Sequence, residues 1–177
     1  AVQDIFQAEL FRVYTNEDIV GCEMGGVLKN VIAIASGMAD GLGAGDNTRS
    51  AVITRGLSEV TRMGVALGGE PLTFSGLAGM GDLVATCIST QSRNRHVGEQ
   101  LGRGQTIDEV IAAMNMVAEG VKTSKVVMEL SDELGIDMPI GSEVYACCHE
   151  GRTAAEAYSG LLRRGTGREM DGIRPAG

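Results

Sequence analysis

A long apolar stretch with helical periodicity, residues 19–39, constrains the fold of this chain more than any other feature. Apolar side chains surround most of the expected helix, so little of it can face water. Glycine-rich residues 40–45 break the pattern, and a second long helical pattern covers residues 46–67 before the stop at Gly68. The sequence therefore predicts two consecutive long helices, the first of them largely buried.

Shorter helical patterns fill most of the remaining chain. Capping boxes from Thr106 to Glu109 and from Thr153 to Glu156 indicate two helix starts, and Pro139 suits the first turn of another helix. Further helices or helical turns are expected at residues 71–77, 79–87, 92–101 and 122–134. About eight helices with almost no strand predict one all-α domain.

The two ends of the chain are expected to differ from this domain. Residues 11–14 are a short β-like run, which either edges the sheet of another domain or is a loop, and Asn16 suits the N-cap of the first long helix. We place the helical domain at residues 15–163. Residues 164–177 show no periodicity and are expected to be a disordered tail.

The composition argues against several classes of partner. The net charge of −8 gives no favourable attraction to the phosphates of a nucleic acid. No uninterrupted apolar run reaches the roughly 18 residues of a membrane span, and residues 1–4 lack the basic and apolar regions of a signal peptide. We therefore expect a cytoplasmic protein that binds neither nucleic acid nor membrane.

Cysteine and glycine usage narrows the chemistry further. Cys147, Cys148 and His149 form the one cluster that suggests a metal, but zinc-type spacing is absent, so reduced thiols on a helix are the favoured interpretation and no metal is expected. The 26 glycines stand against only three prolines. This ratio indicates closely packed helices, or loops that line a site, rather than a linker.

Lys29 is an anomaly within the apolar first helix. Gly25 and Gly26 lie four and three residues before it, in the turn that a helical lysine covers, and each costs about 1 kcal/mol relative to alanine inside a helix. One interpretation is the floor of a ligand pocket into which Lys29 points, with Asn30 at its rim. The other is a surface lysine beside a close helix contact, and the two are equally compatible with this helix.

Two further segments carry candidate chemistry. Residues 76–82 combine three glycines with Asp82 at a helix start, which suits either a site carboxylate or a plain N-cap. Residues 92–95 place a serine, two arginines and an asparagine at a helix start, which suits phosphate, although a solvated basic turn is the commoner outcome. The glycines of residues 41–45 follow a helix and lack dinucleotide-loop spacing, so we interpret them as a helix–helix connection.

Together these segments resemble one known family. The GGVLKN run at 25–30, the TFSGLAGMGDL run at 73–83 and the SRNR run at 92–95 are similar to the C-terminal domain of bacterial NAD(P)-dependent glycerol-3-phosphate dehydrogenase. The resemblance covers residues 11–162 and implies an all-α fold like the C-terminal domain of 6-phosphogluconate dehydrogenase. It also implies a preceding Rossmann domain for the cofactor, of which residues 1–14 would be a remnant.

The resemblance implies roles for individual residues. Lys29 is the expected general acid/base for the reduction of dihydroxyacetone phosphate to sn-glycerol 3-phosphate, a precursor of phospholipids, by NADH or NADPH. Asp82 is expected beside it, in contact with the substrate. The other expected contacts with the substrate come from Lys29 itself, Ser92, Arg93, Asn94, Asn30 and Thr86. The expected contacts with the cofactor come from Arg93, Val117 and Glu119.

Several hypotheses compete with this interpretation. A related hydroxyacid or 6-phosphogluconate dehydrogenase domain would change the substrate, but the SRNR run argues against it. A non-catalytic dimerisation or interaction module predicts that Lys29, Asp82 and Arg93 lie far apart, whereas an active site predicts that they line one cleft. We expect the chain alone to be inactive without its Rossmann domain, and it could form a homodimer through apolar surface that this domain would cover.

Overall fold

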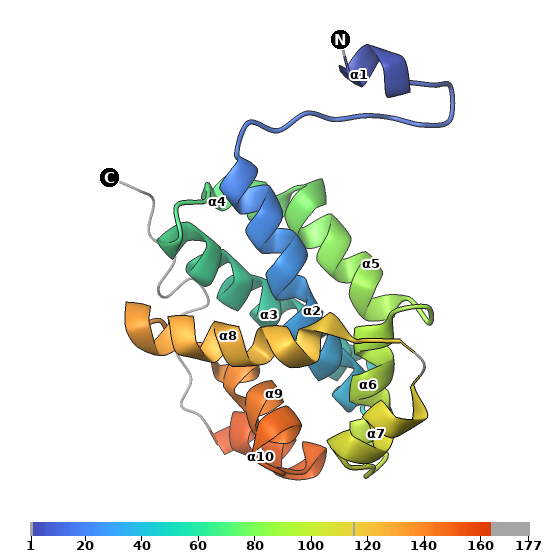
Figure 1. Cartoon of the computed structure of the whole chain (residues 1–177), viewed down its shortest axis with the longest axis vertical. Helices are drawn as coiled ribbons and strands as arrows, with labels where there is room; N and C mark the ends of the chain where they lie inside the picture. Colours follow the sequence, from blue (N-terminus) through green and yellow to red (C-terminus); the bar gives the residue numbers. More distant parts are fainter. Residues whose placement is uncertain (1, 115, 164–177) are drawn as a thin grey trace.

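The computed structural model describes residues 2–114 and 116–163, and within these ranges the chain contains ten α-helices, one π-helical turn and no strand (Figure 1). The predicted all-α fold is confirmed. In chain order the elements are α1 (Val2–Phe6), α2 (Ile19–Gly41), α3 (Asp46–Ala66), α4 (Pro71–Ser75), the π turn η1 (Leu77–Gly81), α5 (Asp82–Ile88), α6 (Arg93–Gly102), α7 (Ile107–Ala113), α8 (Glu119–Leu134), α9 (Pro139–His149) and α10 (Ala154–Arg163).

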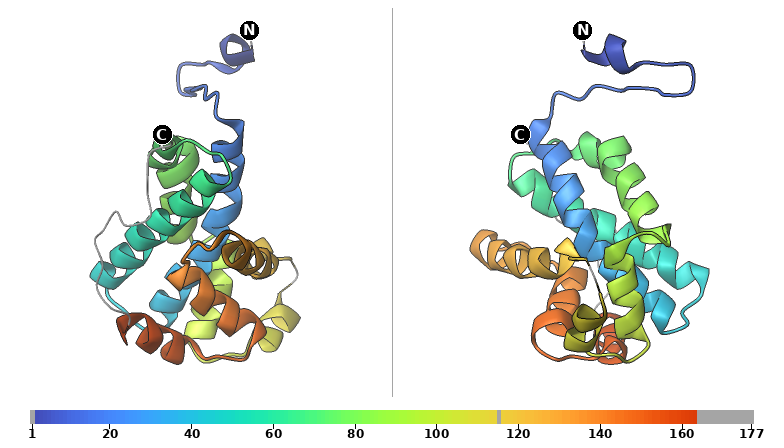
Figure 2. Two further views of the ribbon diagram at one scale, coloured as in Figure 1. Left: turned by 90° about the vertical axis from the view of Figure 1, so that its left-hand side faces the viewer. Right: turned by 45° about the vertical axis from the view of Figure 1, so that its right-hand side comes forward.

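Helix α2 runs through the centre of the domain and contacts α3, α5, α6, α8 and α9 (Figures 1 and 2). Its middle residues, 31–34, are at most 1% exposed and form the centre of the apolar core. By length and composition α2 would also suit a membrane span, although half of its most apolar window is buried by the rest of the protein. The expectation that the chain binds no membrane therefore stays a prediction.

Glycines allow α2 and α6 to pack backbone against backbone. A Cβ atom on Gly37 would overlap the carbonyl oxygen of Arg95, and a Cβ atom on Gly98 would overlap a carbonyl oxygen of α2. Gly41 and Gly102 meet in the same way one turn later. The close helix packing that the glycine content indicates is thus present, and it fixes the residues at the start of α6 relative to α2.

A buried carboxylate caps the start of α9. Glu59 on α3 is 2% exposed, and its two oxygens accept the N–H groups of Ile140 at 2.8 Å and Gly141 at 3.1 Å. Burial raises the pKa of Glu59 to about 7, while the two N–H donors act in the opposite direction. Pro139 occupies the first turn of α9 as predicted, since a helix start needs no N–H from that residue.

Residues 11–14 form no strand in the described chain, so of the two alternatives that the sequence left open the loop is the one present. The N–H group of Val13 donates to the side chain of Gln7 at 3.0 Å, and its carbonyl oxygen accepts from the side chain of Gln3 at 2.7 Å. A strand exists only through pairing with another strand, and here glutamine side chains take the backbone groups. The short helix α1 precedes this extended loop and has no counterpart in the sequence prediction.

The N-cap of α2 is Asp18 rather than Asn16. Asp18 accepts the N–H of Gly21 at 2.7 Å and also the N–H of Glu70 at 2.8 Å, from the loop between α3 and α4. These two bonds, the Gly21 bond first, hold the pKa of Asp18 below its usual value. The prediction for Asn16 is wrong because its oxygen accepts the N–H of Asp18 itself, at 2.9 Å.

Both predicted capping boxes are present. Thr106 accepts the N–H of Glu109 at the start of α7, and the Glu109 carboxylate accepts the N–H of Thr106 in return. Thr153 and Glu156 make the same pair of bonds at the start of α10. The predicted tail at 164–177 lies outside the residues that the structure describes.

Candidate active site

Lys29 and Asp82 form an ion pair between α2 and the first residue of α5. The Lys29 side chain is 18% exposed and the Asp82 side chain is 41% exposed, so the pair lies at the edge of the core with access to solvent. The structure thus brings together two residues that are 53 positions apart in the predicted site. Their chemical roles remain predictions.

A π turn delivers Asp82 to this position. The predicted helix over residues 79–87 is in fact η1 followed by α5, and the N–H of Gly81 donates to the carbonyl oxygen of Gly76 at 3.1 Å, five residues earlier. Such π turns are rare in proteins, and those that occur are often found at functional sites. Thr86, one turn into α5, donates its hydroxyl to the carbonyl oxygen of Asp82 at 2.7 Å, which places Thr86 beside the pair.

The two glycines before Lys29 have different surroundings. A Cβ atom on Gly25 would lie 2.6 Å from the carbonyl oxygen of Ala78 in η1. A Cβ atom on Gly26 would meet nothing within 4 Å. Gly25 therefore fits the interpretation of a close helix contact. Gly26 fits the interpretation of a pocket floor, because it leaves open space one turn before Lys29.

Asn94 connects three of the predicted site segments. Its side-chain amide donates to Asn30 at 2.9 Å, and its side-chain oxygen accepts the N–H of Gly120 at 2.9 Å. Asn94 is 9% exposed, so these bonds are shielded from water. A Cβ atom on Gly120 would lie 2.6 Å from the Asn30 carbonyl oxygen, so α8 starts directly against the α2 backbone. The residue next to Lys29 is thereby joined to α6 and α8.

The two arginines at the start of α6 have different environments. The guanidinium of Arg95 donates to one oxygen of Asp40 from two nitrogens, at 2.8 and 2.9 Å, so it is not available to a phosphate. The sequence left a phosphate site and a solvated basic turn open for this run, and Arg95 matches neither, because its partner Asp40 lies 55 residues earlier in sequence. Arg93 has an exposed side chain. Ser92 is the N-cap of α6 and accepts the N–H of Arg95 at 3.2 Å.

The residues predicted to contact a cofactor lie at the surface near these bonds. Arg93, Val117 and Glu119 have exposed side chains, and Gly120, the next residue, is bonded to Asn94. Their contacts with a cofactor stay a prediction. The glycine-rich residues 41–45 lie elsewhere, between α2 and α3, where Gly45 is the N-cap of α3, so they are a helix connection as predicted.

The cysteine cluster is part of the helix packing. Cys147 and Cys148 are free and buried, and burial raises the pKa of each to about 12. The ring nitrogen Nε2 of His149 lies 3.1 Å from the hydroxyl of Ser124 and 2.9 Å from the carbonyl oxygen of Val121. In the described part of the chain, no three His, Cys, Asp or Glu side chains gather as a metal site.

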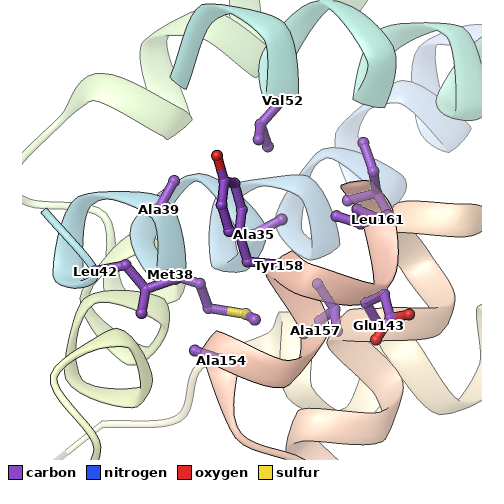
Figure 3. Close-up of a pocket in the computed structure, with 12 residues that line it drawn as sticks. Ala35, Met38, Ala39, Leu42, Val52, Glu143, Ala154, Ala157, Tyr158 and Leu161 are labelled. Atoms are coloured by element: carbon purple, nitrogen blue, oxygen red, sulfur yellow. The ribbon is translucent and has the colours of Figure 1, made fainter. Parts of the chain in front are cut away.

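An apolar cavity of about 30 Å³ lies between α2, α3, α9 and α10 (Figure 3). Met38, Leu42 and Tyr158 are among its lining residues. Glu143, the charged residue of the lining, is paired with Arg152 at 2.6 Å. No residue of the predicted site lines this cavity, so it adds nothing to the chemistry around Lys29.

Comparisons with known proteins agree on one family. Residues 18–159 match the family model described as "NAD-dependent glycerol-3-phosphate dehydrogenase C-terminus". Among curated relatives, a glycerol-3-phosphate dehydrogenase [NAD(P)+] 2 of Sphingopyxis alaskensis is 61% identical over 96% of this chain and 51% of its own length. A glycerol-3-phosphate dehydrogenase [NAD(P)+] of Mycobacterium avium is 57% identical over 95% of this chain and 49% of its own length.

Solved structures give the same result. The glycerol-3-phosphate dehydrogenase of Coxiella burnetii has a TM-score of 0.87 at 41% identity and is matched over 92% of this chain and 50% of that one. A yeast glycerol-3-phosphate dehydrogenase has a TM-score of 0.82 at 28% identity, over 90% and 47%. The chain spans about half the length of the relatives it matches.

Proposed function

The chain belongs to the NAD-dependent glycerol-3-phosphate dehydrogenase C-terminal family, and we propose that it is the substrate-binding half of an enzyme that reduces dihydroxyacetone phosphate to sn-glycerol 3-phosphate. The observation that carries this proposal is the Lys29–Asp82 ion pair, which adjoins the hydrogen bonds of Asn30 and Asn94. The partner is a Rossmann domain, and the enzyme is cytoplasmic, needs no metal and supplies phospholipid synthesis.

Lys29 is the proposed proton donor. The cofactor, NADH or NADPH, supplies when bound the hydride that adds to the carbonyl carbon of the substrate. The Lys29 ammonium gives its proton to the carbonyl oxygen and balances the negative charge that develops there. The neutral amine then regains a proton from solvent, which its 18% exposure permits. In the reverse direction the same amine accepts the proton of the alcohol.

Asp82 holds the ammonium in place. Its carboxylate is paired with Lys29, and Thr86 donates to the Asp82 backbone at 2.7 Å. A lysine side chain has several rotatable bonds, and fixing its end reduces the freedom that must be lost when the substrate binds. Asp82, Thr86 and Asn30 would then surround the reacting carbonyl.

The start of α6 is the proposed phosphate-binding side. The exposed guanidinium of Arg93 can bind two oxygens of a phosphate at once, and Ser92 and Asn94 flank it on the same helix start. Arg93 would also reach the cofactor, together with Val117 and Glu119. Arg95 supports this side through Asp40 instead of binding the substrate.

The alternative of a non-catalytic interaction module is less well supported. It predicts that Lys29, Asp82 and Arg93 lie apart. The structure pairs Lys29 with Asp82, and it bonds Asn94, the neighbour of Arg93, to Asn30, the neighbour of Lys29. These two links, one to Lys29 and one to its neighbour Asn30, favour the enzyme.

The test joins this chain to the N-terminal half of the Sphingopyxis alaskensis relative and follows NADH or NADPH oxidation with dihydroxyacetone phosphate. We expect turnover in the joined protein, and a decrease of roughly 10²- to 10⁴-fold in kcat for Lys29→Ala, because the general acid is lost. Lys122→Ala is the matched control, since Lys122 is exposed on α8. Near-normal turnover in a folded Lys29→Ala variant would exclude the role given to Lys29.

A further inference from the structure

We propose that Gly25 is a positioning residue, because its direct backbone contact with η1 sets where Asp82 meets Lys29. The role in turnover rests on the function proposed above, whereas the geometric role does not. Gly25 lies four residues before Lys29 on α2 and is buried. It has no side chain that could touch a ligand, so it acts only through η1.

The contact at Gly25 is backbone against backbone. A Cβ atom there would lie 2.6 Å from the carbonyl oxygen of Ala78 and 3.6 Å from the Cα of Gly79. A side chain could rotate away from such a contact, but a carbonyl group inside a helical turn cannot. Reaching an ordinary contact of 3.4 Å would require α2 and η1 to separate by roughly 0.8 Å.

A second close contact restricts that movement, because η1 also packs against α4. A Cβ atom on Gly79 would overlap the backbone of Phe74, and the Phe74 side chain is 0% exposed within the core. The π turn is therefore in close backbone contact with α2 at Gly25 and with Phe74 of α4 at Gly79. A displacement at Gly25 must pass along η1 toward its end.

Asp82 is directly attached to that end. Its backbone N–H donates to the carbonyl oxygens of Leu77 and Gly79, so its position follows that of η1. Its carboxylate contacts the Lys29 ammonium and lies 3.4 Å from the Thr86 hydroxyl. A shift of η1 therefore separates Asp82 from Lys29, while Gly26, with no atom within 4 Å of its Cβ position, exerts no such control.

The first test detects the Lys29–Asp82 ion pair directly and needs no enzymatic activity. The chain has only three lysines, and Lys122 and Lys125 are both exposed. Proton exchange of a lysine ammonium slows when a carboxylate holds it, so NMR of ¹³C,¹⁵N-labelled lysine at low temperature separates Lys29 from the other two. We expect Gly25→Ala to remove the slowly exchanging Lys29 signal and Gly26→Ala to retain it.

The second test measures turnover in the joined protein. Gly25→Ala should lower kcat roughly 10- to 100-fold, leave KM for the cofactor unchanged and shift the pH profile of kcat, because only the proton donor is misplaced. The control for a general packing defect is Gly56→Ala, where the new Cβ overlaps the side chain of Ile32 on α2 and not η1. This variant should lower stability without moving the pH profile.

A second route to the same displacement covers the case in which Gly25→Ala does not fold. Gly79→Ala displaces η1 at its other close contact, because the new Cβ would lie 2.2 Å from the carbonyl oxygen of Phe74. Loss of the Lys29 signal is again expected. The proposal is overturned if a folded variant of either kind keeps the slow Lys29 signal. If the signal is lost but the joined wild-type protein shows no turnover, the proposed function fails and the geometric role stands.

Discussion

Charged side chains in the interior of this domain each hold a specific partner. Glu59 holds two backbone N–H groups at the start of α9, Asp18 holds two at separate places, and Arg95 holds Asp40. Buried charges are tolerated only when such partners replace water. Removing Glu59 would leave the N–H groups of Ile140 and Gly141 without their acceptor, whereas Asp40 would keep Arg49 if Arg95 were removed.

Glu59 should make the stability of the domain depend on pH. Its pKa is about 7 in the folded state and about 4.5 when unfolded, so the folded state binds more protons between these values. The free energy of unfolding should therefore fall as pH rises from 4.5 to 7, by roughly 3 kcal/mol for this group, and then level off. Urea unfolding at pH 5 and pH 7.5 measures the change.

The matched variant for this experiment is Glu59→Gln, which cannot ionise. It should be less stable than the wild type at pH 5, because its amide nitrogen cannot accept one of the two N–H groups on α9. Its decrease between pH 5 and pH 7.5 should be smaller than that of the wild type. An equal decrease in both proteins would show that other groups cause the pH dependence.

Sequence reasoning found the site residues whose signal is local. Lys29 stood out because a lysine followed two glycines in an apolar helix, and the structure places Asp82 against it. It did not foresee the ion pair of Arg95 with Asp40 on another helix, and it placed the N-cap at Asn16, whose oxygen instead accepts the N–H of Asp18. A side chain's choice between solvent, ligand and a distant carboxylate depends on tertiary contacts that no short window contains.

Among the helices, glycine determines which pairs can approach most closely. Gly37 and Gly41 on α2 face Gly98 and Gly102 on α6, and this contact supports the helix start that carries Ser92 to Asn94. Small residues four positions apart lie on one face of a helix, so each pair forms a flat strip. The strip acts on the site indirectly, by fixing α6.

Gly98→Ala should destabilise the domain by roughly 2 kcal/mol, because the new Cβ overlaps the Ile34 carbonyl oxygen and forces α2 and α6 apart. Gly26→Ala is the matched comparison for stability, since it is also a helical glycine but its Cβ meets nothing. That variant should gain up to about 1 kcal/mol from helix propensity alone. Urea unfolding of the two proteins compares them, and similar changes in both would argue against the glycine contact.

Helix starts were predictable where the capping residues are neighbours in sequence, as at Thr106 and Thr153. The π turn η1 was not, because five residues with i to i+5 bonding have no side-chain pattern of their own. The run at 11–14 has the residue types of a strand but is a loop, because it has no partner strand in the described chain. Propensity predicts an element only when its hydrogen bonds are internal to it.

At the scale of the whole molecule, the site lies where the domain leaves apolar side chains uncovered. Val27, Leu77, Met80 and Val117 are each more than 40% exposed and belong to the segments around Lys29 and Asn94. We expect this surface to be where the proposed Rossmann domain packs. The all-α class was predictable throughout, since helical periodicity is a property of the sequence itself.

The chain alone should be folded but inactive. Its core is centred on α2 and is complete within the described helices, so far-UV circular dichroism should show a helical protein that unfolds cooperatively. NADH oxidation with dihydroxyacetone phosphate should be absent, and should appear only when the N-terminal half is joined. Turnover by the isolated chain would contradict the proposal that the N-terminal half is needed to bind the cofactor.

The side chain of Asn94 bonds both α2 and α8, which has a consequence for how the binding of one ligand would affect the binding of another. Its oxygen holds the first turn of α8, and its amide holds Asn30 beside Lys29. A cofactor that shifts α8 therefore changes the strain on the residues that surround the substrate. With the proposed function, thermodynamic linkage requires the substrate to alter the affinity for the cofactor by the same factor, and we expect Asn94→Ala to weaken that coupling.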